Sequence, residues 1–273
     1  MNLVNATRSE LSKQFSTSVW WVLLIVLVLY IGGTAGGMAA VFAAGENGSL
    51  PGTTSLPTGL GDRLPSLIYG LATAMGYVFP LVVGSLLVTG EYRHKTLTPT
   101  FLATPRRGIA LSAKMLAGVV MGLVFGVAAV GSTVAAGGGM LALFGVDPQL
   151  ARPETWAFLG RMLLALVLWV LLGIALGTLI RNQIAAVVGI LAFTQFVEPI
   201  ARVGASMVEG LADVVRFLPG AASDALAGDS IYAAMGGGAS QSLDWWAGGL
   251  VLAAYVVVFA VIGYAVSWRR DVA

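Results

Sequence analysis

Residues able to do chemistry gather in one polar stretch of an otherwise apolar chain, from Gly90 to Lys114. Its charged side chains suit ion pairs and partner docking better than bond cleavage. The sequence has no cysteine and a single histidine, His94, so it offers neither a thiolate nucleophile nor a histidine cluster for a metal ion. We therefore expect no catalytic residue and no metal site in this chain.

Two Thr-Pro steps, Thr98-Pro99 and Thr104-Pro105, punctuate this stretch. A hydroxyl residue at the N-cap followed by proline at the first helical position is a typical helix start. The pattern predicts a short helix of about one and a half turns, with Phe101 and Leu102 exposed on it, and a second helix start after it. The basic residues alone are also explained by membrane topology and anionic lipid, but the exposed apolar pair and the two prolines favour a docking surface.

Six apolar stretches position this segment, and all but the fifth reach the length of about 20 residues that crosses a bilayer. The chain is 58% hydrophobic and 10% charged, which excludes an ordinary water-soluble domain. The fifth stretch runs into Glu198-Pro199, where we expect it to end or break. The predicted spans are Ser18 to Phe42, Leu64 to Thr89, Met115 to Phe144, Met162 to Ile180, Gln183 to Val197 and Trp245 to Trp268. None carries a charge through its middle, so we predict an all-α integral membrane protein with one transmembrane domain over residues 1–273.

The basic residues predict the orientation, because Lys and Arg in short loops stay on the cytoplasmic side. With the N-terminus inside, the inner segments hold 10 basic and 3 acidic residues, and the outer segments hold 5 basic and 10 acidic residues. Both termini are therefore expected in the cytoplasm. A signal peptide cleaved near Ala40 to Gly45 is the alternative, but the apolar stretch exceeds the roughly 7 to 15 residues of a signal peptide core.

Two further helices are expected outside the spans. Residues 1–17 carry apolar side chains at helical spacing and predict a helix that lies on the cytoplasmic leaflet. The outer segment 198–244 contains a second amphipathic pattern, from Met207 to Leu218, which Pro219-Gly220 ends. That pattern predicts an outer helix between the fifth and sixth spans.

Small and aromatic residues within the spans suggest packing and a path. Gly118, Gly122 and Gly126 recur every four residues, which leaves one face of the third span nearly flat for close helix packing. The partner helix lies either in the same chain or in another subunit. Trp169 lies in the middle of the fourth span, where it either faces a substrate path or packs between helices.

The polar stretch resembles the permease family of type-2 ATP-binding-cassette (ABC-2) exporters. The resemblance is carried by Gly90-Glu91, then Thr96-Leu97, then Leu102-Ala103-Thr104-Pro105, Arg107 and Lys114. In that family an acidic residue, a short cytoplasmic coupling helix and a proline-and-arginine turn join the second span to the third. The amphipathic N-terminal helix, the six spans and the outer helix are similar to the family in architecture.

The resemblance implies that this chain is the membrane half of an exporter in a bacterial inner membrane. It would pair with a second six-span chain, identical or different, and with two cytoplasmic ABC ATPase subunits that bind ATP and Mg. Residues 90–110 would form the coupling segment. Phe101 and Leu102 would insert into the ATPase, and the charged contacts of Glu91, Arg106 and Arg107 would fix the loop. Thr96, Leu97 and Pro105 belong to the same segment.

The sequence is consistent with an energy source that lies on another subunit. It contains no Gly-Lys pair, so the phosphate-binding loop of an ATPase is missing and the chain itself is not expected to be an enzyme. The predicted spans also lack the acids, histidine and lysine that ion-driven transporters use. Spans without charges favour a hydrophobic or lipid-like substrate, and nothing indicates a nucleic acid partner.

Three rival functions remain. A partner-free secondary transporter or channel would use Glu198 and Arg202 as its coupling site. A membrane-embedded enzyme would need a Ser/His, Asp/Asp or metal-ligand set at matching depth. An ABC permease that serves import or signalling shares all the features above.

Overall fold

The computed structural model describes residues 2–46, 61–205, 210–228 and 243–268. Within these ranges the regular structure is helical, and six helical stretches are long and apolar enough to cross a membrane. The prediction of an all-α, multi-pass membrane protein is confirmed at this level. The six stretches are Val19–Gly45, Gly61–Arg93, Arg107–Leu143, Pro153–Leu179, Gln183–Ala205 and Trp245–Trp268.

The second span, predicted as one stretch from Leu64 to Thr89, is broken into two helices. After α1 (Leu3–Phe15) and α2 (Val19–Glu46), the span consists of η2 (Gly61–Arg63), α3 (Leu64–Ala74) and α4 (Val78–Arg93). The break at residues 75–77 has a local cause. Pro80 donates no backbone hydrogen bond, and its ring conflicts with the carbonyl of Gly76, four residues earlier.

The third and fourth spans begin earlier than predicted, since their helices continue beyond the apolar stretch. The short helix α5 (Leu97–Ala103) leads to α6 (Arg107–Ser132), the π-helical turn η3 (Thr133–Gly138) and α7 (Gly139–Leu143). The helix α8 (Pro153–Leu179) starts with proline at its first position, where the missing N–H has no consequence.

The fifth span does not end at Val197. It runs through α9 (Gln183–Ala192), the π-helical turn η4 (Phe193–Val197) and α10 (Glu198–Ala205). A π turn opens the regular hydrogen-bond ladder, and Pro199 is the second residue after it, where a missing N–H is tolerated. As a result, Glu198 and Arg202 belong to the span, and the expectation of spans without acids is wrong.

The outer segment contains a helix that we did not predict. The amphipathic pattern is represented by α11 (Leu211–Val215), and residues 207–209 of it lie outside the described residues. Pro219 then begins α12 (Pro219–Ala227) rather than a loop. This helix is buried between α8 and the start of α14 (Trp245–Gly263), which ends in the π-helical turn η5 (Tyr264–Trp268).

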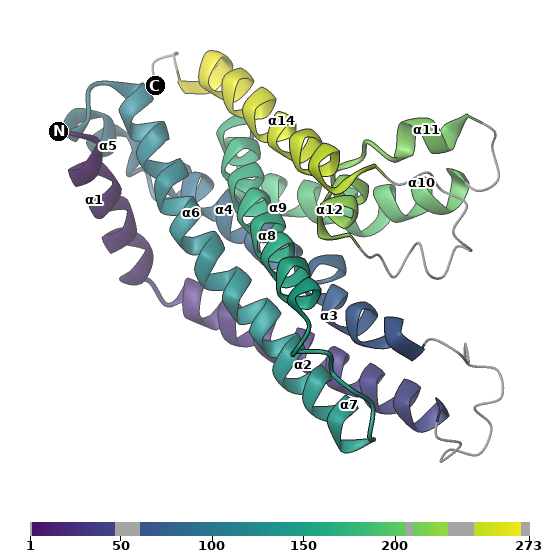
Figure 1. The fold of residues 1–273 in the computed structure, drawn as a ribbon. Coiled ribbons are helices and arrows are strands. Elements are labelled where there is room, and N and C mark those ends of the chain that lie inside the picture. The colour runs from purple at the N-terminus through teal and green to yellow at the C-terminus, as the bar shows by residue number, and fades with distance from the viewer. Residues whose placement is uncertain (1, 47–60, 206–209, 229–242, 269–273) are drawn as a thin grey trace.

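The long helix α8 forms the centre of the bundle, with α4, α6 and α14 packed against it, while α2 lies alongside α6 (Figure 1). Glycines permit these close approaches. A Cβ atom at Gly122 would lie 2.8 Å from the Cα atom of Val167, and one at Gly126 would lie 2.5 Å from a methyl carbon of Leu163. The glycine face of the third span therefore lies against α8 of the same chain, together with Gly118, which meets Ile174.

The outermost helices expose apolar side chains. Leu29 of α2 is 70% exposed, Val188 of α9 is 58% exposed and Val257 of α14 is 60% exposed. Apolar surface on this scale suits contact with lipid or with a further transmembrane chain.

Candidate functional site

The elements expected in the cytoplasm meet at one end of the bundle (Figure 1). Helix α1 packs against α6, and the ring of Phe101 in α5 lies 5.3 Å, edge-on, from that of Trp268 in η5. The N-terminal helix, the polar stretch and the end of the sixth span thus form one joint structure. We refer to this joint structure as the predicted cytoplasmic end.

The short helix expected in the polar stretch is present as α5, but its boundaries differ from the prediction. It begins at Leu97, two residues before Pro99, and Thr96 precedes it without a side-chain cap. The second helix, α6, begins at Arg107 instead of Pro105. Each Thr-Pro step therefore lies close to a helix start, but neither threonine acts as the predicted N-cap.

The two apolar residues assigned to docking differ in exposure. Leu102 is 77% exposed, whereas Phe101 is half-buried against Trp268. The guanidinium of Arg107 lies 5.1 Å from the centre of the Phe101 ring and donates a hydrogen bond of 2.6 Å to the backbone carbonyl of Trp268. The expectation that Phe101 is exposed is wrong, because residues from the far end of the chain cover it. Leu97 is buried as well.

Four charged side chains, which we call the charge ring, join α1, α4 and α6. Lys114 Nζ lies 2.7 Å from Glu10 Oε2 and 3.0 Å from Glu91 Oε2. Lys13 Nζ lies 2.6 Å from Glu10 Oε1 and 2.9 Å from Glu91 Oε1. Each cation therefore contacts both carboxylates, and the four charges alternate in sign. Thr100 of α5 joins the ring by accepting from Lys13 at 3.2 Å.

Three members of the ring are buried, since Lys114 is fully enclosed, Glu10 is 5% exposed and Glu91 is 7% exposed, while the Lys13 side chain is 41% exposed at its edge. Burial alone would raise the pKa of Glu10, but the charge and hydrogen bond of Lys114, helped by Lys13, bring that pKa below its ordinary value of 4.5. Burial would lower the pKa of Lys13, but its hydrogen bond to Glu10 and the charge of Glu91 raise it above 10.5. Both shifts favour the charged forms, so the ring holds α1 in place when all its members are ionised.

This linkage predicts that acid releases α1. Because the pKa of Glu10 is lowered in the docked state, its contribution to docking is complete above pH 4.5 and is lost as the pH falls through the lower, docked-state value. A nitroxide label on Arg8→Cys, an exposed position of α1 in a chain without other cysteines, should become mobile in that range. Its electron paramagnetic resonance spectrum measures the transition. With Glu10→Gln the label should already be mobile at neutral pH, and a spectrum that still shows the acid transition would contradict the assignment to Glu10.

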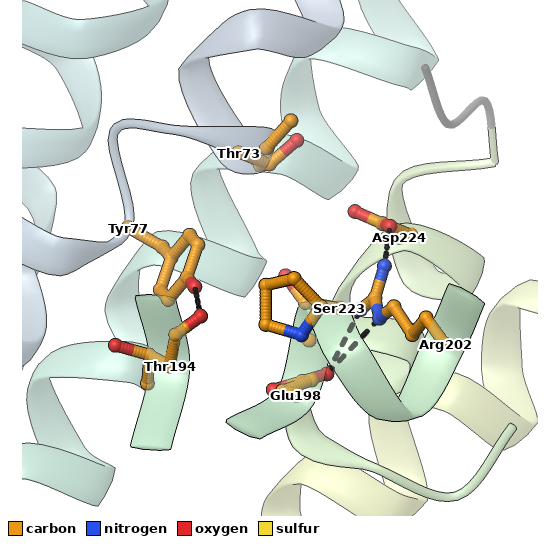
Figure 2. Close-up of a pocket in the computed structure, with 10 residues that line it drawn as sticks. Thr73, Tyr77, Thr194, Glu198, Arg202, Ser223 and Asp224 are labelled. Atoms are coloured by element: carbon orange, nitrogen blue, oxygen red, sulfur yellow. Dashed lines mark hydrogen bonds and ion pairs between the residues drawn. The ribbon is translucent and has the colours of Figure 1, made fainter. Parts of the chain in front are cut away.

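A second polar cluster joins α10 to α12 (Figure 2). Arg202 donates to Glu198 Oε1 from Nε at 3.2 Å and from Nη2 at 2.9 Å. It also donates to Asp224 Oδ2 from Nη1 at 2.7 Å. We predicted the first pair as a rival coupling site, and the structure adds Asp224 and buries the Glu198 side chain to 3% exposure.

Trp169 packs beside this second cluster rather than facing open space. It is 1% exposed, its ring centre lies 4.5 Å from that of Tyr77, and its Nε1 donates to Ser223 Oγ at 2.9 Å. Tyr77 and Ser223, but not Trp169 itself, line a small cavity at the cluster. Of the two readings of Trp169, the structure therefore supports the packed aromatic.

The comparisons with known proteins give no match, so the function of this chain has to be argued from its structure. No protein-family model matches this chain, and no curated protein matches it. Sequence reasoning missed Glu10, Lys13 and Asp224. The available signal was that Glu10 and Lys13 lie on the polar face of a helix otherwise suited to the membrane surface, three residues apart.

Proposed function

We propose that this chain is the transmembrane subunit of an ABC-2 type exporter. It would lie in a bacterial inner membrane with both termini in the cytoplasm, and it would move a hydrophobic or lipid-like substrate outward. ATP and Mg would act on a separate ATPase subunit, present in two copies. The observation that carries the proposal is α5, which presents Leu102 to solvent while its other contacts tie it to four other elements.

Those contacts suit a helix that transmits force. A displacement of Leu102 would be transmitted to η5 through the contact of Phe101 with Trp268. It would be transmitted to α1 and α4 through the hydrogen bonds of Thr100 to the charge ring. A largely buried ring of alternating charges resists gradual deformation, because moving Lys114 away from the two buried carboxylates would leave desolvated charges with fewer partners. Motion of α5 would therefore shift the cytoplasmic ends of several spans together.

This arrangement supports a rigid-body cycle. ATP binding would bring the two ATPases together, move α5 in each membrane subunit, and rock two six-span chains about a path between them. The exposed apolar faces of α2 and α14 supply surface for a second chain, identical or different, or for lipid. The same parts would serve an ABC permease for import or signalling.

A second candidate is a partner-free secondary transporter. The buried cluster of Glu198, Arg202 and Asp224 favours it, since ionisable groups inside a span are costly and usually functional. Recovery of an ATPase with this chain separates the two candidates.

The test is co-expression with the genes that neighbour the gene of this chain, followed by purification through a tag on this chain and a search for an ABC ATPase that co-purifies. Leu102→Asp should reduce recovery of the ATPase roughly tenfold or more, because a charge replaces an exposed apolar contact. The matched control is Leu143→Asp, which alters a leucine that is 80% exposed at the opposite end of the bundle. Wild-type recovery with Leu102→Asp would remove α5 as the docking element, and no ATPase with the unmodified chain would favour the secondary transporter.

A further inference from the structure

The charges at the predicted cytoplasmic end are sorted by burial. The two acids that the structure describes there, Glu10 and Glu91, are buried in the charge ring and contact its two lysines. The exposed cations of this end that lie outside the ring are Arg8, Arg93, Lys95, Arg106 and Arg181. None of these five forms an ion pair with a described residue, so the described surface of this end is positive.

Three of the exposed cations frame the apolar tip of α5. Arg93 and Lys95 precede this helix and Arg106 follows it, and we call these three residues the basic frame. Leu102 lies between them in the sequence and is 77% exposed. Because α5 has 7 residues and is therefore only about 10 Å long, the basic frame and Leu102 fit within the area of a single protein contact.

A groove of about 290 Å³ lies between α1, α5 and the start of α6. Small side chains form much of its lining, among them Ser9, Pro99, Ala103, Ala110 and Ala113. The first three of these are exposed, so the groove is open at the surface next to Leu102. At about 30 Å³ per molecule, it has room for about ten waters or for a large side chain of a partner.

Leu102 and the groove lie outside the hydrocarbon of the predicted membrane. The apolar run of the third span begins at Met115, whereas α6 already begins at Arg107. The stretch from Arg107 to Lys114 extends the helix by about 12 Å beyond the apolar run, and α5 lies beside the start of α6 (Figure 1). Acyl chains therefore do not reach Leu102 or the groove, but the side chains of a water-soluble partner do.

We propose that the partner ATPase binds this end through an acidic surface that surrounds an apolar depression. Its carboxylates would pair with the basic frame, the depression would take Leu102, and one of its own side chains would fill the groove. This inference rests on the proposed function and adds the chemistry of the partner surface. Because opposite charges attract before contact, the basic frame should affect the rate of association more than the rate of dissociation.

The first experiment measures binding of the co-purified ATPase to the full-length chain in phosphatidylcholine nanodiscs. Raising sodium chloride from about 0.05 to about 0.5 M should lower the association rate constant roughly tenfold or more, because salt screens the attraction. Lys95→Glu and Arg106→Glu should each slow association several-fold and weaken its salt dependence. The matched control is Arg152→Glu, which reverses an exposed arginine at the opposite end of the bundle.

The groove is tested separately. Ala103→Trp places a large side chain at the groove without removing a charge, so it should speed dissociation roughly tenfold and leave association nearly unchanged. The matched control is Ala151→Trp, which alters an exposed alanine at the opposite end of the bundle. The unfolding midpoint of each variant should equal that of the unmodified chain, which separates lost docking from lost folding.

Four results would count against the inference. If Leu102→Asp abolishes binding but salt and both charge reversals do not affect it, the partner surface is not acidic and the exporter proposal stands. If salt dependence is missing in phosphatidylcholine and appears only with phosphatidylglycerol, the basic frame binds lipid headgroups instead. If Ala103→Trp binds like the unmodified chain, the groove lies outside the contact. If no ATPase co-purifies with the unmodified chain, the inference and the exporter proposal both fail.

Discussion

Replacing Lys114 with methionine is expected to destabilise the chain by about 3–5 kcal/mol and to free α1 from the bundle. Lys114 is fully buried and contacts both Glu10 and Glu91, so its loss leaves two enclosed carboxylates that share only Lys13, whose side chain is 41% exposed. Denaturant unfolding in detergent measures the free energy, and the spin label on α1 reports its release.

Two comparisons make the Lys114 prediction specific. Arg106→Met removes an exposed charge from the same segment and should change stability by less than about 0.5 kcal/mol. Adding Glu10→Gln and Glu91→Gln to Lys114→Met should recover part of the loss, because no buried charge is then left unpaired. If the single and the triple variants are equally unstable, shape rather than charge holds this end together.

Replacing Gly173 with alanine is expected to separate α4 from α8, at a cost of about 3 kcal/mol or more. The new Cβ atom would overlap the backbone carbonyl of Leu81 and lie 2.9 Å from the backbone nitrogen of Ser85. Backbone atoms within a packed helix have no rotamer by which to move aside. The amount of folded chain after membrane extraction and its unfolding midpoint measure the effect.

The control for Gly173 lies on the same helix. A Cβ atom at Gly160 would meet nothing within 4 Å, so Gly160→Ala should be neutral or should gain up to about 1 kcal/mol from helix propensity. Equal tolerance of both substitutions would show that α4 and α8 pack less closely than these distances indicate.

The sequence predicted the spans because each is a long apolar run, a property of neighbouring residues. The break in the second span was also readable, since Gly76 and Pro80 stand four residues apart. The helix α12 could not be predicted from the sequence, because a proline such as Pro219 occurs both just after the end of one helix and at the start of another. Its small side chains, such as Ala222 and Ser223, become buried only after α8 and α14 surround them.

The candidate site was predictable in its location but not in its contacts. The spacing of glycines in the third span predicted a flat face, but this spacing does not indicate which helix packs against that face. Likewise, Phe101 was expected to be exposed because its cover, Trp268, lies near the other end of the chain. The charge ring required Glu10 and Lys114 to meet across 104 residues, and no local pattern contains that information.

The turn η4 allows the second half of the fifth span to rotate about the helix axis relative to the first half. A π turn holds one residue more than the α-helical ladder needs, and each residue corresponds to about 100° of rotation around the axis. If residues 193–197 tightened into an α-helix, everything beyond them would rotate by that angle. Glu198 and Arg202 would then leave Asp224 and turn toward a different side of the bundle, without any change in the first half of the span.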